Sequence, residues 1–238
     1  MSNKNYLSIY AKSFNWAGFF LPKKTYQKCS ALYDFCRTID NIADDKGELD
    51  IKRKNLLTFK NDFINKNFNN IIIKDMWDLM DRHLITIKIV EDLFDGFESD
   101  LNKKIQLNNK KDLLIYSYRV AGTVGLMMAK ILNVKNQNSM RAAIDLGIAM
   151  QLTNISRDVV EDSKINRFYI KNDFETISDT LTLADLFYKS SFIAIKEIPF
   201  KCRFAILVAR RVYKKIGYKI LRTRNIESYN KAGKIYVN

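Results

Sequence analysis

Two pairs of aspartates with the same spacing are the strongest chemical signal in this sequence. Asp40 and Asp44 are four residues apart, and Asp158 and Asp162 repeat that spacing. On a helix, residues four apart lie on one face, so each pair would set two negative charges side by side. Such a pair is costly, and more so when partly buried, unless a cation compensates it. Mg²⁺ prefers oxygen ligands and commonly bridges carboxylates to phosphates, so the two pairs predict a metal-bound diphosphate.

Other polar side chains extend each aspartate pair along its expected helix. Gln151 and Asn154 share the stripe of the second pair, and Tyr33 and Arg37 share the stripe of the first. In an ordinary surface helix the polar and apolar stripes lie on opposite sides. Here an apolar stripe runs directly beside the second polar stripe, which indicates an internal cavity with one polar and one apolar wall. The apolar stripe consists of Ile148, Leu152, Ile155 and Val159.

A solvated helix face is the alternative reading of these aspartates. A single pair at this spacing is common on exposed helices, where Asp158 could pair with Arg157 or Lys164 and contribute a few tenths of a kcal/mol. Two such pairs, each beside apolar residues, favour the metal site.

Residues that break helices are scarce, with eight Gly and two Pro in 238 residues. Apolar residues recur at spacings of three and four along most of the chain, which predicts helices. We therefore expect an all-α protein with one domain over residues 1–238. The expected helices span about 22–44, 51–66, 74–100, 110–133, 137–163, 182–197 and 200–222, with a gap near 164–181.

The formal net charge of +14 favours an anionic partner, such as nucleic acid, lipid headgroups or a diphosphate. The lysines are scattered and no nucleic-acid-binding motif occurs, so we expect no nucleic acid partner. No apolar run is long enough to span a bilayer, and the N-terminal residues do not resemble a signal peptide. Three cysteines without a CxxC spacing are most simply free thiols in a reducing cytoplasm. The only histidine, His83, has no companion motif, and we expect it to be structural.

Several blocks of the sequence, in order from about residue 10 to the C-terminus, resemble the squalene/phytoene synthase family. LYDFCRTIDNIADD and GIAMQLTNISRDVVEDSKINRFYI resemble its two aspartate-rich regions, and YSYRVAGTVGLMMAKIL resembles the segment between them. KSFNWAGFFLP, DLFDGFESDL and RFAILVARRVYKKIGYKI resemble three further blocks. The resemblance is strongest to the bacterial-type phytoene and dehydrosqualene synthases.

The resemblance implies an isoprenoid synthase fold, with a single helical domain around a central cavity. It implies a head-to-head (1–1′) condensation of two prenyl diphosphates through a cyclopropylcarbinyl diphosphate. The expected reaction joins two geranylgeranyl diphosphates into phytoene, in carotenoid biosynthesis, with Mg²⁺ (or Mn²⁺) and without a nicotinamide cofactor. We expect a cytoplasmic monomer bound peripherally to anionic membranes. The alternatives are a dehydrosqualene or squalene synthase that uses farnesyl diphosphate, or a noncatalytic family member that acts as an assembly factor.

The resemblance also assigns roles to individual residues. Lys234 stands where the family carries a diphosphate-binding arginine, and Gly122 and Gly125 are expected to allow close helix packing or a kink. Arg37 and Tyr118 join the four aspartates as catalytic residues. The expected metal ligands are Asp40, Asp44, Asn154, Asp158 and Asp162. The expected substrate-binding residues are Ser13, Phe14, Tyr33, Arg37, Gln151, Asn154, Arg157, Tyr213 and Lys234.

Overall fold

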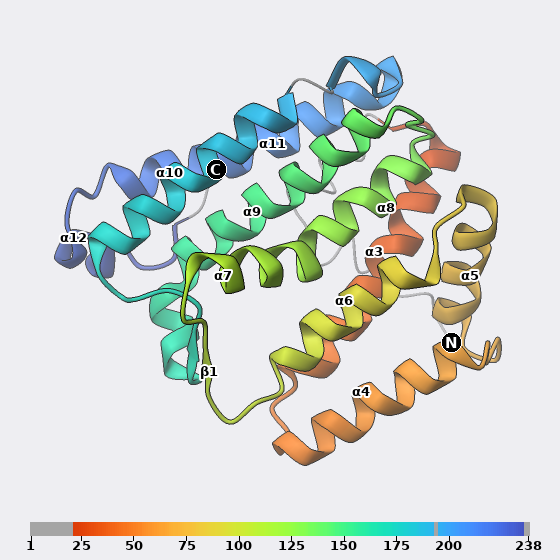
Figure 1. The fold of residues 1–238 in the computed structure, drawn as a ribbon, viewed down its shortest axis with the longest axis horizontal. Helices are drawn as coiled ribbons and strands as arrows, with labels where there is room; N and C mark the ends of the chain where they lie inside the picture. The colour runs from red at the N-terminus through yellow and green to blue at the C-terminus, as the bar shows by residue number, and fades with distance from the viewer. Residues whose placement is uncertain (1–20, 193–194, 236–238) are drawn as a thin grey trace.

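The computed structural model describes residues 21–192 and 195–235, and these form a bundle of helices (Figure 1). The first half comprises α3 (Lys23–Asp44), α4 (Leu49–Ile64), α5 (Ile71–His83), α6 (Ile87–Ser99), strand β1 (Ile105–Gln106) and α7 (Lys110–Ser117). A π-helical turn (Tyr118–Gly122) joins α7 to α8 (Thr123–Ile131). The second half comprises α9 (Gln137–Lys164), strand β2 (Arg167–Phe168), α10 (Phe174–Phe192), a 3₁₀ turn (Ile195–Glu197), α11 (Phe200–Leu221) and α12 (Ile226–Ala232).

Helix α9 runs through the middle of the bundle and contacts α8, α10 and α11 (Figure 1). Its start is set by Asn136, whose side-chain oxygen accepts hydrogen bonds from the amides of Asn138 and Ser139. Two glycines allow α8 and α9 to approach closely. A β-carbon on Gly125 would lie 2.2 Å from the carbonyl oxygen of Ala143, and one on Gly147 would lie 2.2 Å from that of Ala121. The expectation of close packing at Gly125 is confirmed, and the π-helical turn that ends at Gly122 supplies the expected irregularity.

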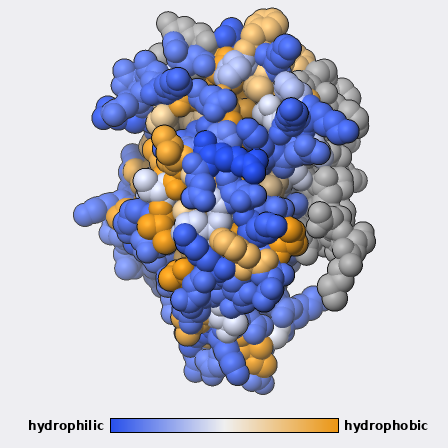
Figure 2. Space-filling model, turned by 90° about the vertical axis from the view of Figure 1, so that its right-hand side faces the viewer, coloured by the Kyte–Doolittle hydropathy of each residue, from blue (hydrophilic) through white to orange (hydrophobic). Residues whose placement is uncertain are grey.

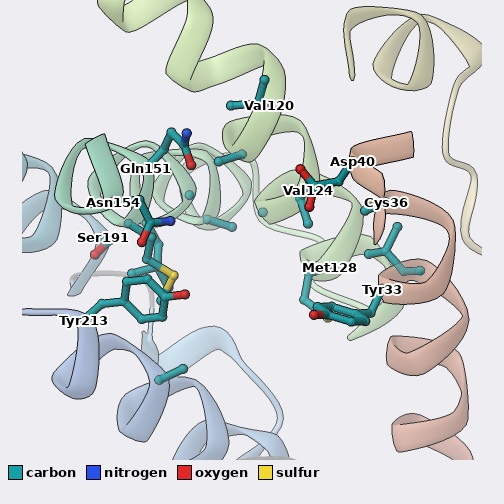
Figure 3. A pocket seen from close by; sticks show the side chains of 18 of the residues that line it. Tyr33, Cys36, Asp40, Val120, Val124, Met128, Gln151, Asn154, Ser191 and Tyr213 are labelled. Atoms are coloured by element: carbon teal, nitrogen blue, oxygen red, sulfur yellow. The ribbon is translucent and has the colours of Figure 1, made fainter. Parts of the chain in front are cut away.

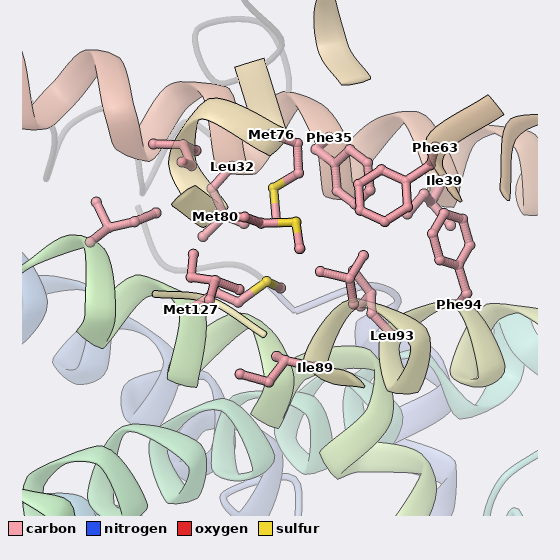
Figure 4. Packing of buried hydrophobic residues seen from close by; sticks show 14 of the residues in the cluster. Leu32, Phe35, Ile39, Phe63, Met76, Met80, Ile89, Leu93, Phe94 and Met127 are labelled. Carbon is pink, nitrogen blue, oxygen red and sulfur yellow. The ribbon is translucent and has the colours of Figure 1, made fainter. Parts of the chain in front are cut away.

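A cluster of aromatic side chains holds α3 against α4, α5 and α6 (Figure 4). Phe35 of α3 lies 5.2 Å from Phe63 and 6.1 Å from Phe94, measured between ring centres. Each ring is almost fully buried, and burying a phenylalanine side chain stabilises a fold by roughly 1.5–3 kcal/mol. Met76, Met80 and Met127 extend the same cluster. Because one face of α3 is held this way, its opposite face is presented at a fixed position.

The expected all-α class is confirmed, and several boundaries differ from those expected. The single helix expected over 74–100 is two helices, since Leu84 adopts a left-handed conformation (φ 52°) that ends α5. Helix α10 begins at Phe174, so half of the expected gap at 164–181 is helical. Helix α12 and the strand pair were not expected, because segments this short carry too little periodicity to be recognised.

The two short strands pair in parallel, with Ile105 opposite Arg167. The amide of Ile105 donates to the carbonyl of Asn166 at 2.9 Å, and that of Leu107 donates to the carbonyl of Phe168 at 3.2 Å. This pairing ties the segment that follows α9 to the segment that follows α6, and so fixes the position of Arg167.

The remaining sequence expectations concern the cysteines, His83 and membrane-spanning segments. All three cysteines are free, and Cys29 and Cys202 are buried. His83 Nδ1 lies 3.2 Å from the carbonyl oxygen of Lys130, a contact between α5 and the end of α8 that agrees with a structural role. Within the described segments, no helix is both long enough and apolar enough to cross a membrane.

We predict that Gly147→Ala lowers the melting temperature measured by circular dichroism. The new methyl group would overlap the backbone of Ala121 and force the π-helical turn and α9 apart, at a cost of about 1–3 kcal/mol. Gly217→Ala in α11 is the control, because its new methyl would meet only the flexible end of Leu181 at 3.2 Å. A Gly147→Ala protein that melts at the same temperature as the parent would contradict the close contact between the π-helical turn and α9.

Candidate active site

A cavity of about 600 Å³ lies between α3, the α7–α8 segment, α9 and α11. Figure 3 shows Tyr33 and Asp40 of α3 facing Gln151 and Asn154 of α9 across this space, with Tyr213 of α11 closing one side. One part of the lining is acidic and includes all four predicted aspartates. The other part is apolar and includes Leu132, Val134, Ile195, Ile198 and Ile206. The cavity therefore has a charged end and an apolar end.

The first wall of the charged end is the face of α3 that carries Tyr33, Arg37, Asp40 and Asp44. The guanidinium of Arg37 donates a hydrogen bond to the Asp40 carboxylate. Asp44 accepts a hydrogen bond from Arg167 Nη1 at 2.8 Å. Each carboxylate on this wall is thus matched by an arginine.

The second wall is the face of α9 that carries Gln151, Asn154, Asp158 and Asp162. Arg157 holds Asp158 with two hydrogen bonds, from Nε at 2.8 Å and from Nη2 at 2.6 Å. Lys234 Nζ lies 3.2 Å from Oδ1 of the same carboxylate, the oxygen that also accepts from Arg157 Nε. This cation arrives from the C-terminal end of the chain.

One carboxylate on each wall, Asp40 on α3 and Asp162 on α9, is difficult to ionise. Burial raises the pKa of Asp40 to about 6, and the neighbouring Asp44 carboxylate adds to the rise. Burial likewise raises the pKa of Asp162 to about 7, and Asp158 adds to that rise. Both pairs therefore carry the like-charge cost that their spacing predicts.

Arg167 connects the two walls. Besides its bond to Asp44, its positive charge lowers the pKa of Asp40 on α3 and that of Asp162 on α9. One guanidinium can act on both carboxylates only because the two helix faces are opposed. The strand pairing of β1 and β2 holds it there, and the sequence analysis did not single it out.

Beside Arg167 lies a buried polar group that the sequence analysis also missed. Asp100 is 8% exposed and accepts hydrogen bonds from the hydroxyls of Tyr116 at 2.8 Å and Tyr169 at 2.7 Å. The two tyrosine rings stack with their centres 4.7 Å apart. Burial raises the pKa of Asp100 to about 6, and Arg167 opposes that rise. All three residues lie in blocks that carried the family resemblance, but no local spacing links positions this distant in sequence.

Helix α12 is what brings Lys234 to the charged end. Asn225 caps the start of the helix by accepting a hydrogen bond from the amide of Ser228. Tyr229 is 3% exposed, and its hydroxyl lies 2.9 Å from the carbonyl oxygens of both Ser156 and Arg157. These contacts clamp α12 onto α9 directly beside Asp158. Five residues later the chain presents Lys234, which also lies 2.7 Å from Glu161.

Three of the predicted site residues are not placed at this cavity. The hydroxyl of Tyr118 donates to Asp92 at 3.1 Å, and Tyr118 is not among the lining residues. Its place in the π-helical turn directs it away, while the next residue but one, Val120, lines the cavity. Ser13 and Phe14 lie outside the described residues. The other predicted catalytic, metal-binding and substrate-binding residues all line the cavity.

The residues of the charged end fit a divalent metal that is shared with a ligand. Within residues 21–192 and 195–235, no three acidic, histidine or cysteine side chains lie close enough to hold an ion by themselves. Each helix instead supplies two carboxylates on one face, and the buried Oδ1 atom of Asn154 has no hydrogen-bond partner. Mg²⁺ usually takes one or two carboxylates and completes its shell with water and phosphate oxygens. The carboxylates of each helix and Asn154 Oδ1 are donors of the kind that Mg²⁺ prefers.

Comparisons with known proteins agree with an enzyme built on such a cavity. A 15-cis-phytoene synthase of Paracoccus sp. is 35% identical over 147 residues, which cover 54% of this chain and 48% of that protein. The phytoene synthase of Pseudescherichia vulneris is 28% identical over 244 residues, which cover 88% of this chain and 78% of that protein. The crystal structure of a dehydrosqualene synthase in complex with ligand superposes with a TM-score of 0.76 at 27% identity, covering 93% and 85% of the two chains.

The helical bundle around this cavity is an isoprenoid synthase fold. A family model described as squalene/phytoene synthase matches residues 7–174. The chain belongs to the squalene/phytoene synthase family.

We predict that Asp162→Asn abolishes turnover but makes the metal-free protein more stable. The pKa of Asp162 is raised to about 7, well above the usual value of about 3.9 in an unfolded chain. Its ionisation therefore costs folding free energy, a cost that grows as the pH rises from about 4 to 7 and is complete above that. The melting temperature of the variant should exceed that of the parent at pH 8 with EDTA, and the difference should shrink at pH 5.

Turnover should fall by at least about 100-fold, since Asp162 is an expected ligand of the metal that would stabilise the leaving diphosphate. The matched control is Asp179→Asn, an exposed aspartate on α10 that does not line the cavity. It should change neither property. An Asp162→Asn protein that is less stable than the parent at pH 8 would show that this carboxylate supports the fold rather than opposing it.

Proposed function

We propose that this protein condenses two prenyl diphosphates head to head, through a cyclopropylcarbinyl diphosphate, to a 1–1′ linked polyene. The observation that carries the proposal is a single cavity with opposed aspartate pairs at one end and an apolar lining at the other. That arrangement fits a molecule with a diphosphate head and a hydrocarbon tail. The family membership and the names of the relatives support the same prenyl transfer chemistry.

The charged end acts on the diphosphate groups. Asp40, Asp44, Asn154, Asp158 and Asp162 would hold Mg²⁺, which would supply Lewis-acid stabilisation of the negative charge that develops as a diphosphate leaves. Arg37, Arg157 and Lys234 now pair with carboxylates of the site, and a bound metal would release them to donate to diphosphate oxygens. A fixed set of cations aimed at the leaving group lowers the barrier to ionisation.

The apolar end holds the prenyl tails and protects the cation that ionisation leaves. Its wall residues come from the segments around α8, the 3₁₀ turn and α11. Leu132, Val134 and Ile198 are aliphatic, so their side chains have no nucleophilic atom that could attack a carbocation. Tyr33 and Tyr213 line the space between the two ends, where the negative faces of their rings stabilise positive charge. Excluding water prevents the cation from being quenched as an alcohol.

We propose geranylgeranyl diphosphate as the substrate and phytoene as the product, because the relatives with high coverage are phytoene synthases. The structural similarity to a dehydrosqualene synthase supports farnesyl diphosphate as the second candidate. We further propose that the enzyme is a cytoplasmic monomer with no nicotinamide cofactor, and that it works at the surface of an anionic membrane. A C40 hydrocarbon cannot diffuse through water, and the net charge of +14 favours anionic lipids.

Incubating the purified protein with radiolabelled C15 or C20 diphosphate, with Mg²⁺ or EDTA and with or without NADPH, tests this assignment. We expect a C40 product from the C20 substrate that requires Mg²⁺ and is unchanged by NADPH. A C30 product alone would select the second candidate. No hydrocarbon from either substrate, under conditions where a known phytoene synthase is active, would contradict the proposed reaction.

Lys234→Ala should reduce the rate by at least about tenfold, or roughly 1.4 kcal/mol of barrier, and Lys234→Arg should preserve or raise it. The physical reason is that a cation next to Asp158 can donate to a diphosphate held at the same end of the cavity. Lys231→Ala, at an exposed position of α12, is the matched control and should be neutral.

The contacts of the Tyr229 hydroxyl with α9 allow a second test of the role of Lys234. Tyr229→Phe removes the hydroxyl that holds α12 on α9, so it should slow the parent enzyme. It should have little further effect when Lys234 is already alanine, because the clamp would then have nothing left to position. Full additivity of the two changes would mean that Tyr229 does not act through Lys234.

A further inference from the structure

Large aromatic side chains stand exposed where α10 ends and α11 begins. Phe200 is 82% exposed, Phe204 is 53% exposed and Phe192 is 55% exposed. We call these three residues the aromatic tip. Phe200 and Phe204 lie one turn apart on α11, and Phe192 is the last residue of α10. Large apolar side chains that are exposed and grouped in this way mark a candidate interaction surface.

Cationic side chains accompany the aromatic tip. The guanidinium of Arg210 lies 4.9 Å from the ring centre of Phe192, and that of Arg203 lies 5.8 Å from that of Phe200. The sequence from residue 198 to 226, which contains α11, has no Asp or Glu. The seven cations on α11 are Lys201, Arg203, Arg210, Arg211, Lys214, Lys215 and Lys219.

Two other segments that reach this end of the molecule also contain basic residues and no acidic ones. Residues 113–144, which include the end of α8 and the start of α9, have no acidic residue, and nor do residues 21–33 at the start of α3. Figure 1 places these helix ends together with the start of α11 at the upper end of the bundle. In Figure 2, apolar residues reach the surface at that upper end among hydrophilic ones. The exposed cations of the two segments include Lys23, Lys24, Lys135 and Arg141.

The aromatic tip and the apolar end of the cavity belong to the same segment. Ile195, Ile198 and Ile206 line the cavity from the inside, while Phe200 and Phe204 face the solvent from the outside. Leu132 and Val134, at the end of α8, line the same apolar end. The apolar end of the cavity therefore lies just beneath the surface that carries the exposed rings.

We propose that the aromatic tip and the cations around it form the surface by which this protein docks on an anionic lipid bilayer. The inference rests on the proposed function, for which the bilayer receives the hydrocarbon product. Aromatic rings that enter the headgroup region, flanked by Lys and Arg, form the composition that binds membrane interfaces. Docking in this orientation sets the apolar end of the cavity against the acyl chains and leaves the charged end in water.

A second copy of this chain fits the surface less well than lipid does. An isologous dimer through the aromatic tip would bring two positively charged faces together, because Glu197 is the one acidic residue from 186 to 226 and cations outnumber it there. An anionic bilayer can bury the rings in its headgroup region and pair the cations with its charged lipids.

Vesicle flotation with pure phosphatidylcholine, or with phosphatidylcholine containing phosphatidylglycerol, tests the proposal. The parent protein should float with the anionic vesicles, and less so as the salt concentration rises. Phe200→Ser with Phe204→Ser should reduce the apparent partition coefficient by at least about tenfold, because two rings no longer enter the interface. Lys201→Glu with Lys135→Glu should cause a loss of similar order on anionic vesicles only.

The matched control is Ile51→Ser with Leu57→Ser, which removes two exposed apolar side chains from α4 at the lower end of the bundle. The control should bind vesicles like the parent. Equal flotation of the Phe200/Phe204 variant and the parent would overturn the proposal. So would sedimentation showing that the parent is a dimer and that the same variant is a monomer, since the tip would then be a contact between copies.

The docking surface can fail separately from the proposed reaction, because flotation needs no turnover. Neither Phe200 nor Phe204 lines the cavity, so their double variant should keep the rate of the parent with substrate in detergent micelles. It should be slower than the parent only with substrate supplied in vesicles. A variant that loses activity equally in detergent and in vesicles would mean that the tip supports the cavity rather than a membrane contact.

Discussion

The arrangement of this protein depends on the repulsion within two pairs of aspartates that line the same cavity. Asp40 and Asp162 show the cost directly, since burial and a neighbouring carboxylate raise the pKa of each. The chain offsets that cost with cations from three different places. Arg37 and Arg157 come from the same helices as the aspartates, Arg167 comes from a strand, and Lys234 comes from the C-terminal end. Those ion pairs offset part of the repulsion in the folded protein, and in the proposed function a metal and a diphosphate replace them.

Opposing two acidic helices requires rigid support on their other sides. Helix α9 is held by the contacts of Gly125 and Gly147, where the backbones of the two helices meet without intervening side chains. Helix α3 is held by the aromatic cluster around Phe35, which occupies the face opposite Asp40. Because both supports are close-packed, the distance across the cavity is set by packing and not by the charges themselves. The repulsion is therefore retained in the folded protein, where it is available to bind metal and diphosphate.

The cavity changes from charged to apolar along its length, and the outer surface next to its apolar end is apolar as well. Carboxylates and arginines gather at one end, Leu132, Val134 and Ile198 line the other, and the exposed rings of Phe200 and Phe204 continue the apolar end outwards. A substrate with a charged head and a long tail can be bound in only one orientation along such a gradient. The product, which has lost both diphosphates, has no group left to hold it at the charged end.

The sequence by itself determined the helical class, the family and most of the side chains of the charged end. Spacings of four residues place Asp40 with Asp44 and Asp158 with Asp162, because a helix brings such residues to one face whatever the rest of the chain does. Only the tertiary structure decided what meets across the cavity. The bond between Arg167 and Asp44 and the group formed by Asp100, Tyr116 and Tyr169 join residues that no local period relates. Tertiary packing also turned Tyr118 towards Asp92 and away from the cavity, since a π-helical turn shifts the register that a regular helix would have kept.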